Sequence, residues 1–94
     1  MTEKITVKTM PRIDASNAPK FEELLIKAMK DGQNSHIAVD MTDTVYISSI
    51  GLRALLSVQK KLHQGNGSMI ITNVKPQIME IFEITGFSGI FTME

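Results

Sequence analysis

Polar and apolar residues recur along the chain with two different periods, and each period predicts a kind of element. Residues 4–8 alternate with a period of two, which is typical of a strand with one buried face. The apolar run at 36–41 predicts a strand covered on both faces, 69–72 another buried strand, and 90–93 a final strand. Residues 11–17 are rich in breakers and short polar side chains, which favours a loop.

Three stretches carry apolar residues at the three-and-four spacing of an amphipathic helix. The first stripe is Phe21, Leu24, Leu25, Ala28 and Met29. The second stripe is Leu52, Leu55, Leu56, Gln59 and Leu62, and the third is Ile78, Ile81 and Phe82. Glycines stand where the three helices should end, at Gly32, Gly65 and Gly86.

The predicted elements alternate in the order β-α-β-α-β-α-β. Strands separated by single helices pair in parallel through right-handed crossovers. The fold class is therefore α/β, with one small, mostly parallel sheet and flanking helices. Because no repeat or linker interrupts its 94 residues, we expect residues 1–94 to form a single domain.

Composition excludes several kinds of chemistry. The chain has no cysteine, which excludes a disulfide scaffold, a thiol nucleophile and a cysteine-ligated metal. Its two histidines, His36 and His63, and its four aspartates show no spacing typical of a catalytic or metal site. The glycines at 65–67 follow a helix instead of opening one, so they do not form a phosphate-binding loop. We therefore expect no enzymatic activity, no cofactor and no metal.

Charge and hydropathy narrow the classes of partner and the cellular locations that fit this sequence. Ten basic and ten acidic residues cancel, and without a basic excess we expect no direct binding of nucleic acid. No apolar run approaches the ~18–20 residues that cross a bilayer, and the N-terminus lacks the apolar core of a signal peptide. The sequence thus favours a cytoplasmic protein without membrane insertion. Its low net charge limits repulsion between copies, so a homodimer stays open.

The most informative segment joins the short apolar stretch 45–47 to the second helix. Ser48 and Ser49 stand at this junction, followed by Gly51. Serine is a preferred helix N-cap because its oxygen accepts an otherwise unpaired backbone N–H. A phosphate at the same place would lie near free N–H groups and the positive end of the helix dipole. The residues alone leave both interpretations open, a helix cap and a phosphorylation site.

Residues 45–56 resemble the signature of STAS domains, specifically of bacterial anti-sigma factor antagonists. The likeness extends to 60–62, 65–67, 74–76 and 82–87, and covers roughly residues 5–93. The resemblance implies the STAS fold and a regulatory role in which phosphorylation controls binding to a partner protein. In the family, the unphosphorylated protein binds a serine-kinase anti-sigma factor and frees the sigma factor. Phosphorylation by that kinase ends the interaction, and a metal-dependent serine phosphatase reverses it.

The resemblance also implies roles for particular residues. By its place in the motif Ser49 is the phosphoacceptor, and Ser48 is the second choice. Asp14 matches a loop acid beside the kinase-facing surface. The residues expected to contact the partner are Asp14, Ser48, Ile50, Gly51, Arg53 and Lys60.

Two features of the second helix each allow two interpretations. Its polar face is either solvated or meets an acidic partner surface, and consists of Arg53, Ser57, Lys60, Lys61 and Gln64. Gly51 is either a packing glycine or a point where a kinase closely approaches the backbone.

The chain departs from the family's pattern in three places. Ser48 stands where many antagonists have aspartate, the N-terminus is shorter than in typical members, and the chain stops at Glu94 where relatives often continue. A missing outer strand would leave a sheet edge that a second copy could pair with. Two further functions stay open: an accessory STAS subunit of a membrane transport system, and a STAS interaction module that is not phosphorylated.

Overall fold

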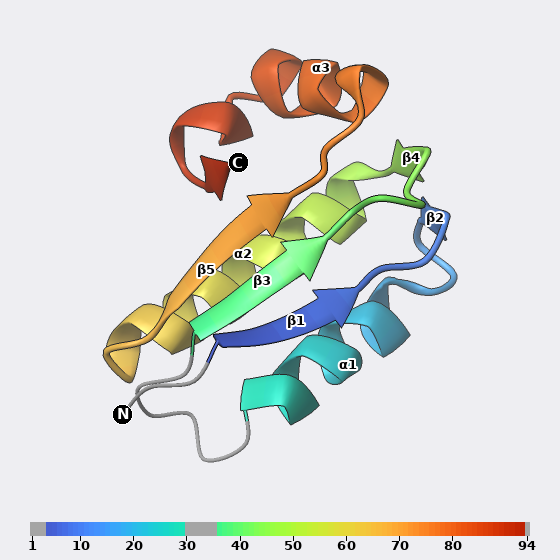
Figure 1. Ribbon diagram of the computed structural model, residues 1–94. Helices are drawn as coiled ribbons and strands as arrows, with labels where there is room; N and C mark the ends of the chain where they lie inside the picture. The colour runs from blue at the N-terminus through green and yellow to red at the C-terminus, as the bar shows by residue number, and fades with distance from the viewer. Residues whose placement is uncertain (1–3, 30–35, 94) are drawn as a thin grey trace.

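A four-stranded parallel sheet forms the centre of the computed structural model, which describes residues 4–29 and 36–93 (Figure 1). The strands are β1 (Lys4–Lys8), β3 (His36–Asp40), β5 (Ser68–Thr72) and β6 (Thr92–Met93), in the spatial order β1-β3-β5-β6. Every pairing is parallel, which confirms the predicted α/β class. β1 is an edge strand of this sheet.

Three helices accompany the sheet (Figure 1). Helices α1 (Ala18–Met29) and α2 (Ser49–Gln64) lie side by side against one face. Helix α3 (Pro76–Ile84) lies beyond the carboxyl ends of the strands, followed by the 3-10 turn η1 (Phe87–Gly89). All three predicted helices are confirmed. The cap predicted at Gly32 lies outside the described residues.

A second, two-stranded ladder lies at the carboxyl end of the main sheet. It pairs β2 (Arg12–Ile13) in parallel with β4 (Tyr46–Ile47). The prediction of a plain loop at 11–17 was therefore wrong at its start, because β2 depends on a partner far away in the sequence. The final strand is also shorter than the predicted 90–93, since the backbone N–H of Ile90 bonds within the preceding turn, to the carbonyl of Phe87.

The core fills the space between the sheet and its two covering helices and continues to the inner side of α3. Its largest fully buried side chains include those of Phe21 on α1, Leu52 and Leu55 on α2, and Phe82 on α3. Gln59 belongs to the buried stripe of α2 as predicted, and its Nε2 donates a hydrogen bond of 3.1 Å to the carbonyl oxygen of Ile90. That bond explains why a polar residue is tolerated among apolar ones.

The opposite face of the sheet carries no helix in the described part of the chain (Figure 1). The predicted burial of β3 on both faces is nevertheless confirmed, since the successive residues Ile37, Ala38 and Val39 are all buried. Ala38 lies on the face without a helix. The register places it between Thr6 on β1 and Ile70 on β5, so the neighbouring side chains shield it.

Candidate functional site at the start of α2

The two serines at the start of α2 have different surroundings. Ser48 is the N-cap: its Oγ accepts a hydrogen bond of 3.3 Å from the backbone N–H of Gly51. Its own N–H donates to the carbonyl oxygen of Ile13 at 2.8 Å, which ties the start of α2 to β2. Ser49 is the first residue of the helix and is exposed. The cap therefore belongs to Ser48, and the hydroxyl of Ser49 remains accessible from solvent.

Asp14 lies beside this junction. The parallel register of β2 and β4 pairs Ile13 with Ile47, so the next residues along, Asp14 and Ser48, are also neighbours. The carboxylate of Asp14 accepts hydrogen bonds from the hydroxyl of Ser16 at 2.6 Å and from its N–H at 3.0 Å. These bonds, led by the one from the hydroxyl, lower the pKa of Asp14 from its ordinary value. Asp14 is thus an ionised acceptor at neutral pH.

A cationic side chain lies next to Asp14. The Nε of Arg12 is 3.9 Å from a carboxylate oxygen of Asp14, and its guanidinium is 4.7 Å from the ring centre of Tyr46. Arg12 and Tyr46 are both exposed. No local pattern of residues predicts this contact, because it follows from the pairing of β2 with β4.

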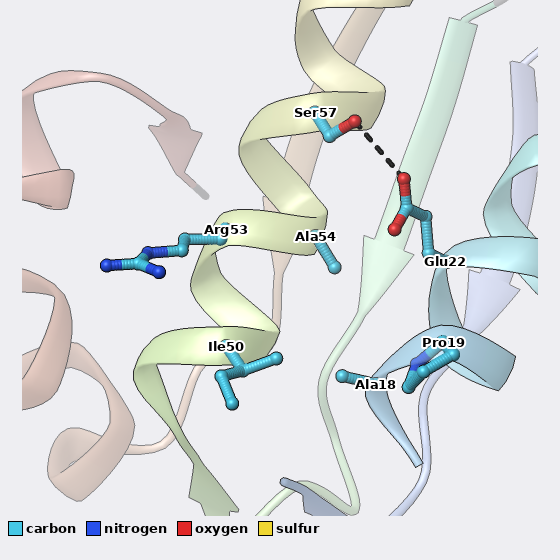
Figure 2. Close-up of a pocket in the computed structure, with 7 residues that line it drawn as sticks. All are labelled: Ala18, Pro19, Glu22, Ile50, Arg53, Ala54 and Ser57. Atoms are coloured by element: carbon cyan, nitrogen blue, oxygen red, sulfur yellow. Dashed lines mark hydrogen bonds between the residues drawn. The ribbon is translucent and has the colours of Figure 1, made fainter. Parts of the chain in front are cut away.

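A groove of about 250 Å³ opens between α1 and α2 next to Ser49 (Figure 2). The side chain of Ile50 projects toward Ala18 across the lower end of the groove, and the residue is 45% exposed. On the upper side the hydroxyl of Ser57 donates a hydrogen bond of 3.1 Å to a carboxylate oxygen of Glu22. The lining residues are Ala18, Pro19, Glu22, Ile50, Arg53, Ala54 and Ser57. Sequence reasoning missed the groove, since half of it comes from α1.

Gly51 is buried beneath this surface. A Cβ built on it would lie 2.6 Å from Cγ2 of Ile13 and 2.9 Å from Cγ1 of Ile47, distances that real Cβ atoms do not show. Its missing side chain lets α2 pack closely on β2 and β4. Of the two interpretations of Gly51, the structure supports packing.

The exposed face of α2 is basic. No aspartate or glutamate occurs among its 16 residues. Arg53 follows Ser49 by one helical turn, and Lys60 follows it by about three turns, roughly 16 Å along the axis. Both are exposed. The structure thus groups Asp14, Ser48, Ile50 and Arg53 around Ser49, and leaves Lys60 on the same face but farther away.

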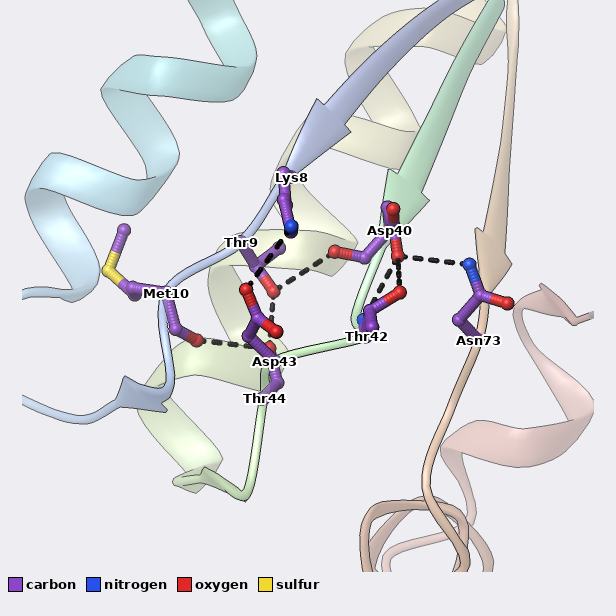
Figure 3. Close-up of polar contacts among 8 residues, drawn as sticks. All are labelled: Lys8, Thr9, Met10, Asp40, Thr42, Asp43, Thr44 and Asn73. Carbon is purple, nitrogen blue, oxygen red and sulfur yellow. Dashed lines mark hydrogen bonds and ion pairs between the residues drawn. The ribbon is translucent and has the colours of Figure 1, made fainter.

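A polar network fixes the chain between β3 and β4, which leads to the site (Figure 3). The carboxylate of Asp40 accepts hydrogen bonds from the hydroxyl and N–H of Thr42 and from Nδ2 of Asn73 at 3.0 Å. The buried hydroxyls of Thr9 and Thr44 bond to each other. The network therefore anchors the segment that carries β4 and Ser48. The bond from the Thr42 hydroxyl, then that from Asn73, lowers the pKa of Asp40.

We expect Asp40→Asn to destabilise the protein at neutral pH and less so in acid. A carboxyl group whose pKa is lowered on folding contributes stability above its unfolded pKa, and loses it as the pH falls through the folded pKa. Urea unfolding at about pH 7 and about pH 2 measures the difference. Asp43→Asn, which removes only an exposed pair with Lys8, is the control and should change stability less. An equal loss for Asp40→Asn at both pH values would contradict this role.

Comparison with known proteins identifies the family. The model of the STAS domain matches residues 5–94. The chain belongs to the STAS domain family. BtrV of Bordetella bronchiseptica, assigned as an anti-sigma factor antagonist, is 37% identical to this STAS domain over 79 residues, which are 84% of this chain and 67% of BtrV. The anti-sigma-B factor antagonist of Listeria monocytogenes is 30% identical over 94 residues, 99% of this chain and 81% of that protein. The predicted membership among the anti-sigma factor antagonists, which are non-enzymatic regulators, is confirmed.

The fold of this STAS domain also matches solved structures. The phosphorylated form of SpoIIAA from Bacillus superposes with a TM-score of 0.71 at 16% identity, covering 98% of this chain and 83% of that one. Within residues 4–29 and 36–93 no helix is long and apolar enough to cross a membrane. In the same residues no three histidine, aspartate or glutamate side chains form a group that could hold a metal ion.

Proposed function

We propose that this STAS domain, residues 1–94, is an anti-sigma factor antagonist switched by phosphorylation of Ser49. In its unphosphorylated form it binds a serine-kinase anti-sigma factor in the cytoplasm and so frees a sigma factor for transcription. Phosphorylation by that kinase releases the partner, and a metal-dependent serine phosphatase restores the binding form. The observation that carries the proposal is the exposed hydroxyl of Ser49 at the first residue of α2, while Ser48 supplies the cap.

The chemistry of phosphoryl transfer favours Ser49 over Ser48. The serine Oγ forms a bond to the γ-phosphorus of ATP, the bond from that phosphorus to the bridging oxygen breaks, ADP leaves, and the hydroxyl proton passes to a base of the kinase. The attacking oxygen must therefore be reachable in line with the leaving group. Ser49 is exposed, whereas the half-buried Ser48 directs its Oγ toward the N–H of Gly51.

The surface around Ser49 has the character of a protein-binding site. It combines exposed apolar side chains, Val45, Tyr46 and Ile50, with the charged groups of Asp14 and Arg53. Interfaces of this kind place apolar and aromatic anchors at the centre and charges at the rim. A phosphate in the middle of such a surface disrupts its contacts with the partner.

The phosphorylation site is tested by incubation with the cognate kinase and ATP, followed by mass spectrometry of the phosphopeptides. We expect a single phosphate on Ser49, and none on the Ser49→Ala variant. A phosphate on Ser48, or no phosphate at all, would overturn the proposed site.

Ile50→Ala should weaken binding of the kinase anti-sigma factor about five- to tenfold. The half-exposed side chain lies at the edge of the groove, and covering it in a complex contributes about 1 kcal/mol or slightly more. Titration calorimetry measures the affinity. The matched control is Leu24→Ala, because Leu24 is similarly exposed, at 41%, but lines a different groove on α1. Equal losses for the two variants would show that the Ile50 surface is not the interface.

Reversing the charges of Lys60 and Lys61 to glutamate should slow association several-fold at low salt and have little effect at high salt. Exposed charges at an interface rim act mainly on the rate of encounter, and salt screens them. Stopped-flow mixing across salt concentrations measures the rate. The control reverses Lys20 and Lys27 on α1, which gives the same change in net charge. An unchanged association rate for the α2 variant at low salt would show that this face is solvated and does not meet the partner.

A further inference from the structure

Arg53 and Ser49 are neighbours on the surface of α2. They are four residues apart in one helix, so their Cβ atoms lie about 5–6 Å apart on the same face. Both residues are exposed. Figure 2 shows the Arg53 side chain extended away from the groove and away from Glu22, the acidic residue of the groove lining.

The guanidinium of Arg53 has no bonded partner within the described part of the chain. The ion pairs there are Lys8 with Asp43, Arg12 with Asp14, and Lys27 with Glu23. Acids near this surface are already engaged, and Glu23 of α1 pairs with Lys27. The carboxylate of Glu22 accepts a hydrogen bond from the hydroxyl of Ser57. The carboxylate of Asp14 accepts hydrogen bonds from the hydroxyl and the N–H of Ser16, and it also lies near Arg12. Because α2 has no acidic residue, Arg53 is, with respect to residues 4–29 and 36–93, an unpaired cation one turn from the proposed phosphoacceptor.

We propose that Arg53 is the counter-ion of phosphorylated Ser49 within the same chain. This inference rests on the proposed phosphorylation of Ser49. Arginine suits the role because its planar fork of N–H donors binds two phosphate oxygens at once. Phosphorylation then changes the partner-binding surface of this chain in two ways. It adds about −1.5 to −2 charges, and it engages the cation of Arg53 so that this cation no longer contacts the partner. Arg53 acts as a positioning residue that strengthens the switch.

The test uses protein with phosphoserine incorporated at position 49 during translation, so that no kinase is involved. Phosphorus NMR follows the second ionisation of the phosphate, whose pKa is ordinarily about 6. We expect Arg53→Gln to raise this pKa by about 0.3 unit relative to the unsubstituted protein, which is the size of effect of an exposed (i, i+4) charge pair. Arg53→Lys should lie between the two, because it keeps the charge but loses the fork. Near 1 M salt the difference should largely vanish.

Lys60→Gln is the matched control, since it removes an exposed cation from the same helix face about three turns away. The phosphate on Ser49 should have the same second pKa in this variant as in the unsubstituted protein. Asp14, Arg12 and Glu22 are present in every variant, so their influence on the phosphate cancels. Titration of Arg53→Gln identical to the unsubstituted protein, or an equal shift for Lys60→Gln, would overturn the pairing.

The two proposals fail in distinguishable ways. If phosphoserine at position 49 blocks partner binding but Arg53→Gln leaves its pKa unchanged, the switch stands and the counter-ion role is wrong. If Arg53→Gln shifts the pKa but the kinase does not modify Ser49, the pairing stands as a property of this surface and the proposed function is wrong.

Discussion

Ser49→Asp is expected to bind the kinase anti-sigma factor at least about 100-fold more weakly than Ser49→Ala, with both variants folded. Ser49 is exposed at the start of α2, where a negative charge is tolerated by the helix with about 0.3–1 kcal/mol in its favour. In the complex the same charge must lose its water next to the carboxylate of Asp14 and among exposed apolar side chains. Such mismatches cost several kcal/mol, and each ~1.4 kcal/mol is a factor of ten in affinity.

The neighbouring serine provides a control of the same charge. Ser48→Asp adds a carboxylate one residue earlier, at the N-cap, where aspartate accepts a backbone N–H as well as serine does. Its carboxylate is held toward the N–H of Gly51, so the loss of affinity should be much smaller than for Ser49→Asp. Equal affinity of Ser49→Ala and Ser49→Asp would contradict the switch. An unfolded Ser49→Asp, seen by circular dichroism, would show that Ser49 is chiefly structural.

Gly51→Val should lower the free energy of unfolding by about 2–3 kcal/mol. Its Cβ alone would overlap the buried side chains of Ile13 and Ile47, and two further methyl groups enlarge the clash. Overpacking of this kind typically costs about 1–3 kcal/mol, of which the better helix propensity of valine offsets only a few tenths. In a domain of this size we expect the melting temperature to fall by roughly 10–20 °C.

Gly89→Val separates this clash from the general effect of replacing glycine by valine. No heavy atom lies within 4 Å of a Cβ built at Gly89, so the substitution should change stability by less than about 0.5 kcal/mol. Denaturant unfolding of both variants gives the comparison. If Gly51→Val were as stable as the unsubstituted protein, α2 would not depend on close approach to β2 and β4.

The helices and the cap could be predicted from the sequence because their signals are local. The apolar stripe of α2, including Gln59, follows from periodicity, and a serine at the end of an apolar strand is a recognisable cap. Only the structure assigns the cap to Ser48 and not to Ser49. Leu24 is the exception in α1: it fits the period but is 41% exposed, because the buried stripe follows Ala18, Phe21, Leu25 and Met29.

The rest of the site depends on contacts between distant segments. The pairing of β2 with β4 brings Asp14 next to Ser48 and sets the packing around Gly51, yet each strand has only two residues and no pattern of its own. The groove forms where α1 meets α2, and nothing in either helix alone indicates it. The position of Asp14 at the partner-facing surface was predicted only from the family resemblance. The residue pattern at 11–17 alone predicts a loop and no role for Asp14.

The central claim is that phosphorylation of Ser49 changes affinity without unfolding the domain. Calorimetric titration of the cognate kinase anti-sigma factor, first with the unmodified protein and then with protein phosphorylated only on Ser49, measures it most directly. We predict a dissociation constant at least about 100-fold larger for the phosphorylated form, a difference of roughly 2.7 kcal/mol or more, with unchanged circular dichroism. The same dissociation constant for both forms would contradict the account.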